Sequence, residues 1–205
     1  MKTFKRLALG GALLIAAAAA ADTSGLPYYS DKTLTPYWPE NQASLPDHRM
    51  ENFRLSNQLG ESFGSSDAEG RIRIVNFFFA TCPGICPLTM FNLRRVRDAI
   101  EGEEAMLLSF SITANIDTPK RLADYAQING IEADNWQLLT GDEPQITALA
   151  EDTFFSVLER NVKANAMAHT ERAYLVDQDG YIRGVYNATS AADILRLVED
   201  MELLR

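Results

Sequence analysis

The sequence predicts a single α/β domain built on a sheet whose central strands are buried on both faces. A run of β-branched and aromatic residues within Arg71–Ala80 is typical of such a strand, and Met106–Thr113 is expected to be a second buried strand. A segment with apolar residues at helical spacing, Pro87–Ile100, lies between them. Setting aside the first 21 residues leaves about 184, enough for one domain with a sizeable core.

The order of the elements narrows this class to a thioredoxin-like sandwich. A hairpin is expected first, from Asn52–Leu55 and Glu61–Phe63 around a turn at Asn57–Gly60. That fold has a central mixed sheet flanked by helices, and its elements follow the order strand, helix, strand, then helix, hairpin and helix. The later elements expected are helices at Thr118–Asn129, Pro144–Glu151 and Ala191–Leu204, and strands at Trp136–Leu139, Ala173–Asp177 and Tyr181–Tyr186.

The N-terminal segment has the layout of an export signal. Lys2, Lys5 and Arg6 precede the apolar run Leu7–Ala21, which ends in small residues suited to cleavage before Asp22. We expect a signal peptide at 1–21, a Pro- and Tyr-rich extended arm at 22–49 and the folded domain at 50–205. An uncleaved signal would leave the chain tethered to the membrane by this N-terminal anchor.

The charge of the chain limits its partners. Its 19 Lys and Arg stand against 28 Asp and Glu, a net charge of −9. Removing residues 1–21 takes away three of the basic residues and no acidic one, which leaves −12. So acidic a surface argues against nucleic acid and anionic membranes, and favours cationic partners or ions.

The two cysteines of the chain stand together where chemistry is expected. Cys82 and Cys86 follow the central strand directly, and Pro87 suits the first turn of a helix. At such a junction the helix N-terminal amides can stabilise thiolates. With a Cα separation of about 6 Å the pair could form a disulfide or, when reduced, clamp one soft metal ion. A purely structural disulfide over so short a loop would stabilise the fold little.

Three segments of the sequence resemble the Sco/SenC family of copper chaperones. The stretch Asn76–Pro87 contains the Cys-Pro-x-x-Cys-Pro motif after an aromatic strand, and Ser111–Pro119 is similar to the family's Asp-Thr-Pro segment. Ala168–Gly180 resembles the family's metal-ligand histidine followed by the last hairpin. The resemblance covers about residues 50–204, and the arm beginning at Leu26 is similar to arms that precede this domain in some members.

The resemblance implies a function and a ligand set. It implies one copper ion per chain, Cu(I) or Cu(II), held by Cys82, Cys86 and His169 outside the cytosol, in a bacterial periplasm. The protein would deliver copper to the binuclear centre in the copper-bearing subunit of cytochrome c oxidase. It would also, or instead, keep the cysteines of that centre reduced. A thiol reductant or another copper chaperone would be a further partner. Two thiolates and an imidazole suit copper on chemical grounds as well.

Three further positions bear on the predicted copper site. Thr113-Ala114 stands where the family commonly has Asp-Pro, so an acidic neighbour of the metal loop is missing. Met167 could offer copper a weak thioether but is expected to be a loop or packing residue. His48, in the Pro-rich entry segment, is expected at the surface.

The alternative function is that of an exported thiol–disulfide oxidoreductase without an obligatory metal, with Cys82 and Cys86 as its redox pair. Three features count against it: the Cys-x₃-Cys spacing, the absence of a proline beside His169, and the lack of any other role for His169. A thiol peroxidase and a non-enzymatic copper sensor are weaker alternatives.

Overall fold

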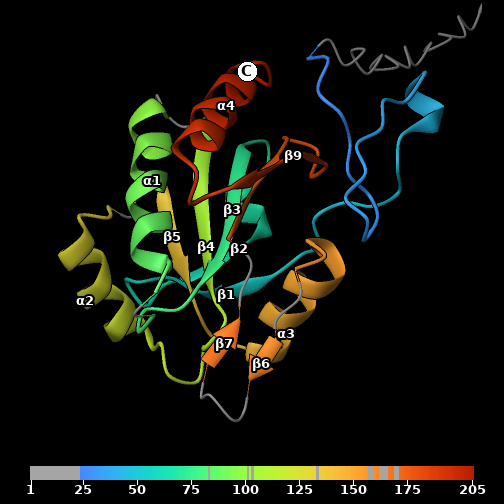
Figure 1. Cartoon of the computed structure of the whole chain (residues 1–205). Coiled ribbons are helices and arrows are strands. Elements are labelled where there is room, and N and C mark those ends of the chain that lie inside the picture. Colours follow the sequence, from blue (N-terminus) through green and yellow to red (C-terminus); the bar gives the residue numbers. More distant parts are fainter. Residues whose placement is uncertain are drawn as a thin grey trace, which may run out of the picture.

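A five-stranded mixed sheet forms the centre of the protein in its computed structural model (Figure 1). The structure describes residues 24–82, 84–100, 102, 104–132, 134–156, 159–161, 166–168 and 171–205. The first three strands in the order β5-β4-β3-β8-β9 are parallel, and the last two run antiparallel to their neighbours. The strands are β3 (Ile72–Phe78), β4 (Ala105–Ser111), β5 (Trp136–Leu139), β8 (Arg172–Val176) and β9 (Ile182–Asn187).

The central strand β3 is buried along its whole length, as its apolar run predicts. It pairs with β4 on one side and with β8 on the other, so its backbone groups are satisfied within the sheet. Its side chains alternate between two separate hydrophobic clusters: Ile74 and Phe78 belong to one, Val75 and Phe77 to the other. The sheet therefore has a core on each face.

Three helices cover the first face: α1 (Cys86–Ala99), α2 (Pro119–Asn129) and α4 (Ala191–Glu202). They contribute, among others, Leu93, Leu122 and Leu197 to the same cluster as Phe78. The ends of α2 are as the sequence predicts. Thr118 caps the N-terminus by accepting a hydrogen bond from the Arg121 amide, and Gly130 ends the helix in the left-handed conformation, with φ 60°.

The second face is covered by the N-terminal hairpin and by α3 (Glu143–Ala148). Strands β1 (Arg54–Ser56) and β2 (Ser62–Gly64) pair antiparallel where the sequence predicts a hairpin. The helix expected at Pro144–Glu151 is present but changes character, because a π-helical turn, Leu149–Thr153, continues α3. Smaller elements complete the chain: 3-10 turns at Gln42–Ser44 and Ser65–Ala68, and an antiparallel pair, β6 (Glu159–Asn161) and β7 (Ala166–Ala168), that the sequence did not predict.

The arm is joined to the edge strand β9. The Tyr29 amide donates to the Ile182 carbonyl (3.0 Å), and Tyr28 is 4% exposed. The Arg183 guanidinium lies 3.9 Å from the centre of the Tyr28 ring, and it donates to the carbonyls of Pro27 and Leu26. Trp38, in contrast, is largely exposed. Among the residues that the structure describes, no helix has the length and apolar character needed to cross a membrane.

Arg183 also forms a buried ion pair with Asp177 in the last hairpin, with Nη1 and Oδ2 3.1 Å apart. Replacing Arg183 by Met would leave the Asp177 carboxylate buried and without its guanidinium partner, and would remove the hydrogen bonds to the carbonyls of Pro27 and Leu26 in the arm. We expect the free energy of unfolding, measured in urea, to fall by about 3–5 kcal/mol. Because burial raises the pKa of Asp177, protonation stabilises the variant, and the deficit should shrink as the pH is lowered from about 7 to about 5.

Lys120→Met is the matched control. Lys120 pairs with Asp124 on the surface of α2 at 2.9 Å, and its side chain is 84% exposed. Its loss should cost no more than about 0.5 kcal/mol. Equal losses for the two variants would contradict the role given to Arg183.

Candidate metal centre

The cysteine pair lies at the carboxyl end of β3, at the junction that the sequence predicts. β3 ends at Phe78, and the Cys82 amide donates to the Phe79 carbonyl (3.2 Å) in the turn that follows. Helix α1 begins at Cys86 and has Pro87 in its first turn. Cys82 therefore lies in a short connection and Cys86 in the first turn of a helix, both at one end of the sheet.

The two thiols differ in depth. Cys82 is half-buried, whereas Cys86 is 1% exposed and belongs to the same hydrophobic cluster as Met90 and Leu93. Burial raises the pKa of the Cys86 thiol, and a hydrogen bond with the Cys82 side chain raises it further. The expected stabilisation of a thiolate by the helix N-terminus is thus outweighed at Cys86. Cys82 is the thiol that a partner or reagent can reach.

A phenol borders the pair from the neighbouring helix. The Tyr125 ring on α2 packs against Phe78, with centroids 5.6 Å apart. Burial raises the pKa of the Tyr125 hydroxyl, and the nearby charges of Cys86 and Cys82 raise it further. The hydroxyl therefore stays protonated near the thiols. Tyr125 belongs to no motif, so the sequence alone does not indicate it.

A buried carboxylate supports the start of the cysteine loop. Asp117 is 0% exposed, and its Oδ2 accepts hydrogen bonds from the Ala80 amide (2.9 Å) and the Thr113 hydroxyl (3.0 Å). Thr113, which stands where the family commonly has an aspartate, thus donates a hydrogen bond to Asp117 in this chain. A carboxylate is therefore present under the loop even though residue 113 is not acidic. Asp117 belongs to the Asp-Thr-Pro segment, the sequence signal through which it could have been found.

The third predicted ligand, His169, lies outside the described residues. The described chain stops at Ala168, the end of β7, and resumes at Glu171, just before β8. Because β8 runs antiparallel to β3, with Ala173 opposite Asn76, the start of β8 lies toward the end of the sheet that carries the cysteines. Met167 is in β7. The ligand roles of Cys82, Cys86 and His169 together stay a prediction, and no group of three His, Cys, Asp or Glu side chains converges within the described part of the chain.

His48, expected at the surface, is instead partly buried. Its Nε2 lies 2.8 Å from the Thr153 carbonyl oxygen, and its ring stacks on Phe155 with centroids 4.7 Å apart. The imidazole thus joins the arm to the turn after α3. This makes His48 a structural residue, held by contacts of its own.

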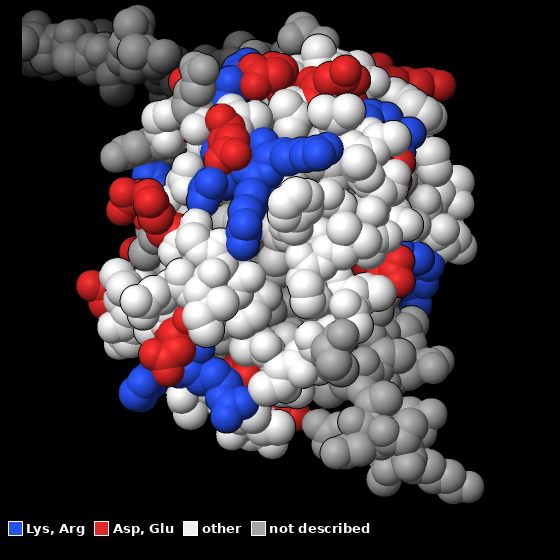
Figure 2. Space-filling view, turned by 60° about the vertical axis from the view of Figure 1, so that its left-hand side comes forward, with Lys and Arg blue, Asp and Glu red and all other residues white. Residues whose placement is uncertain are grey.

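The segment that carries Cys82 is uncharged. No Lys, Arg, Asp or Glu occurs between Phe79 and Leu93, and this stretch exposes Leu88 (49%) and Phe91 (54%) on α1. Figure 2 shows the side of the molecule on which α1 and α2 lie, with an uncharged area between groups of charged side chains. A partner that approaches Cys82 along α1 would therefore meet apolar contacts before charged ones.

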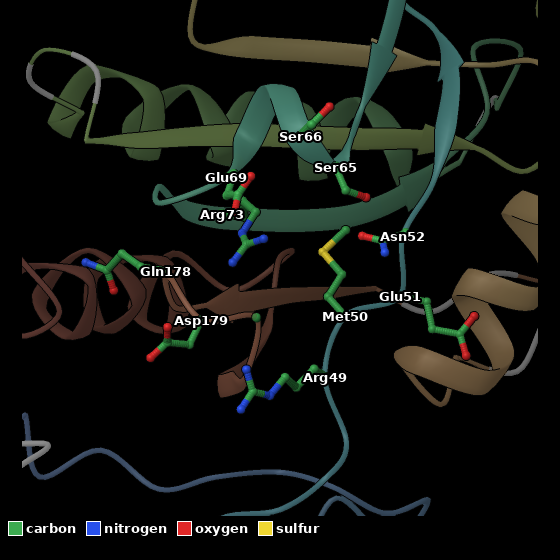
Figure 3. A pocket seen from close by; sticks show the side chains of 11 residues that line it. Arg49, Met50, Glu51, Asn52, Ser65, Ser66, Glu69, Arg73, Gln178 and Asp179 are labelled. Carbon is green, nitrogen blue, oxygen red and sulfur yellow. The ribbon is translucent and has the colours of Figure 1, made fainter. Parts of the chain in front are cut away.

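A cavity of about 490 Å³ lies at the other end of the sheet. Figure 3 shows Arg73, near the start of β3, between Glu69 and Asp179, with Arg49 below. The charges of these side chains largely compensate one another, and neither cysteine lines the cavity. It is therefore separate from the candidate metal centre.

Comparison with known proteins identifies a matching family and similar solved structures. The family model described as SCO1/SenC matches residues 41–202. A SCO1/SenC family lipoprotein from Bacillus anthracis str. Ames has a similar structure, with 28% identity and a TM-score of 0.71 over 77% of this chain and 95% of that one.

Two further solved structures are similar. One is that of BsSco, a member of the Sco family of cytochrome c oxidase assembly proteins in which a disulfide switch has been identified. It is 26% identical, with a TM-score of 0.63 over 77% of this chain and 95% of that one. The other is Bradyrhizobium japonicum ScoI with copper bound, which at 20% identity shows the fold, with a TM-score of 0.63 over 77% of this chain and 99% of that one.

The unequal burial of the cysteines predicts unequal reactivity. On brief treatment of the reduced protein with iodoacetamide at a pH of about 8, Cys82 should be alkylated at least about tenfold faster than Cys86, because Cys86 is buried and its pKa is raised. Peptide mass spectrometry measures the two rates. Protein unfolded in urea is the control, in which the rates should converge; equal rates in the folded protein would contradict the arrangement.

Proposed function

The chain belongs to the SCO1/SenC family, and we propose that it is a copper metallochaperone that serves the binuclear copper centre of cytochrome c oxidase. In this proposal it delivers copper to the copper-bearing subunit, reduces that subunit's cysteines, or does both. The observation that carries the proposal is the thiol pair at the end of β3, with one sulfur accessible and the other fixed in the core.

The donor set fits copper. Thiolates are soft ligands that select Cu(I), and an imidazole from His169 would give a Cys₂His set that also accepts Cu(II). The proposed stoichiometry is one copper per chain, because the chain has only these two cysteines. Copper bound in the Bradyrhizobium ScoI structure, which has the same fold, supports this assignment.

Transfer would begin at Cys82. A ligand of the receiving protein can approach the metal from the side of the half-buried Cys82, while Cys86 is held by the packing of α1. Ligand exchange then moves the ion without exposing the core. The uncharged surface around Phe79–Leu93 lets an apolar rim of the partner come close without desolvating charges.

Reduction of a partner's disulfide would use the same two thiols. The Cys82 thiolate attacks one sulfur of the disulfide, and the other sulfur leaves as a thiolate. Cys86 then loses its proton and displaces the partner from the mixed disulfide, forming the Cys82–Cys86 disulfide. The partner gains two electrons and two protons, and an external thiol reductant must restore the pair. Oxidation also removes both thiolate ligands from copper at once.

The cellular setting belongs to the proposal as well. The predicted signal at 1–21, outside the described residues, and the lipoprotein from Bacillus anthracis both favour an exported, membrane-associated protein. The proposed location is the periplasm of a bacterium, with a tether to the inner membrane where the signal is not cleaved.

An exported thiol–disulfide oxidoreductase without an obligatory metal is the second candidate. The pairing of an accessible Cys82 with a buried Cys86 favours it, because this is the arrangement of an attacking and a resolving thiol. The disulfide switch identified in BsSco is consistent with redox chemistry in a relative.

Copper binding separates the two candidates. The reduced protein, titrated with Cu(I) without oxygen against a competing chelator, should bind one ion per chain. Cys82→Ser should weaken binding at least about 100-fold, because it removes a ligand and not merely a supporting group.

His48→Ala is the control, since it removes the chain's other imidazole at a place where that ring is bound to Thr153. It should leave the affinity unchanged. Wild-type binding no stronger than that of Cys82→Ser would contradict the chaperone proposal and favour the oxidoreductase.

A further inference from the structure

One carboxylate oxygen of Asp117 accepts three hydrogen bonds, from two segments of the chain. Its Oδ2 accepts hydrogen bonds from the Ala80 amide (2.9 Å), the Ser111 hydroxyl (2.7 Å) and the Thr113 hydroxyl (3.0 Å). Ala80 lies two residues before Cys82, and Ser111 is the last residue of β4. The carboxylate thus connects the cysteine loop to the end of the neighbouring strand.

The backbone of Asp117 is fixed as well. The Thr140 hydroxyl, at the end of β5, donates to the Asp117 carbonyl (2.6 Å), and the Asp117 amide donates to the Thr113 carbonyl (2.8 Å). The next residue, Thr118, caps α2. The carboxylate therefore projects from a point that β4, β5 and α2 all hold in place.

The position of the cysteine loop depends on this anchor. The sheet's hydrogen bonding to β3 ends where the Ile112 amide donates to the Phe78 carbonyl (2.9 Å). Beyond that point the Ala80 amide is bound by Asp117, and on the far side of the loop Cys86 is fixed by burial in the core. Cys82 stands between these two fixed points.

The second oxygen of the carboxylate indicates a role beyond packing. Asp117 Oδ1 is buried, and no described group forms a hydrogen bond with it. A buried carboxylate with one unsatisfied oxygen costs free energy, so stability alone does not explain it. Such local costs are typical of residues retained for a functional site.

We propose that Asp117 is a positioning residue for Cys82, whose carboxylate holds the loop so that the two sulfurs face a common metal ion or one another. The part of this inference that concerns copper binding rests on the proposed function, whereas the part that concerns the disulfide needs only the cysteine pair. A two-sulfur clamp tolerates displacements of only a fraction of an ångström, so the outer contacts that orient its ligands control affinity.

Asp117→Ala removes the acceptor for all three donors. We expect Cu(I) affinity to fall at least about tenfold, within the range seen when outer-sphere partners of metal ligands are lost. The equilibrium constant of the Cys82–Cys86 disulfide with a reference dithiol, measured on the metal-free protein, should change at least about threefold. Asp117→Asn keeps an acceptor oxygen in place and should restore both quantities to within about threefold of wild type.

Asp177→Asn is the matched control. Asp177 is also buried, and its carboxylate accepts hydrogen bonds from the Asp179 and Tyr181 amides and from Arg183, but in the last hairpin. It should lower the stability of the fold and leave copper affinity and the disulfide equilibrium unchanged. If Asp117→Ala matches this control in both readouts, Asp117 only stabilises the fold and the inference is overturned.

A second variant covers the case in which Asp117→Ala does not fold. Ser111→Ala combined with Thr113→Val removes the two hydroxyls that orient the carboxylate, and should weaken Cu(I) binding about threefold or more and shift the disulfide equilibrium in the same direction as Asp117→Ala. Wild-type values for both would overturn the inference. A wild-type protein that binds no copper would refute the proposed function, while the disulfide equilibrium would still test the positioning role.

Discussion

The burial of β3 on both of its faces is the constraint on which the rest of the structure depends. A strand paired on both sides and covered on both faces cannot shift or slip, because every side chain would move to the wrong cluster. The loop that leaves it at Phe78 therefore starts from a fixed point. Helix α1 must return onto the first face, which places Cys86 in the core and leaves Cys82 at the rim. The unequal depth of the two thiols follows from the packing of the sheet.

Two buried carboxylates perform similar tasks at opposite ends of this sheet. Asp117 binds the cysteine loop to the ends of β4 and β5. Asp177 closes the last hairpin and, through Arg183, holds the arm that leads toward the N-terminus. The end of the sheet with the reactive pair is thus separated from the end that fixes the arm.

Local patterns in the sequence predicted the elements that local physics determines. The apolar run of β3, the Thr118 cap and the Gly130 end of α2 each depend on a few neighbouring residues, and the structure confirms them. The pair β6–β7 has no alternating apolar pattern, so the sequence did not indicate it. The hydrogen bond of Asp117 to the Ala80 amide and the bond of His48 to Thr153 join residues distant in sequence, and the different depths of Cys82 and Cys86 depend on how α1 packs on the sheet. Only the tertiary structure could reveal them.

X-ray absorption at the copper edge of the loaded protein tests the account most directly. The account predicts two sulfur neighbours and a histidine nitrogen, from Cys82, Cys86 and His169. The nitrogen signal should be lost in His169→Ala and retained in His48→Ala. A single sulfur neighbour, or a spectrum that does not change in His169→Ala, would contradict the proposed centre.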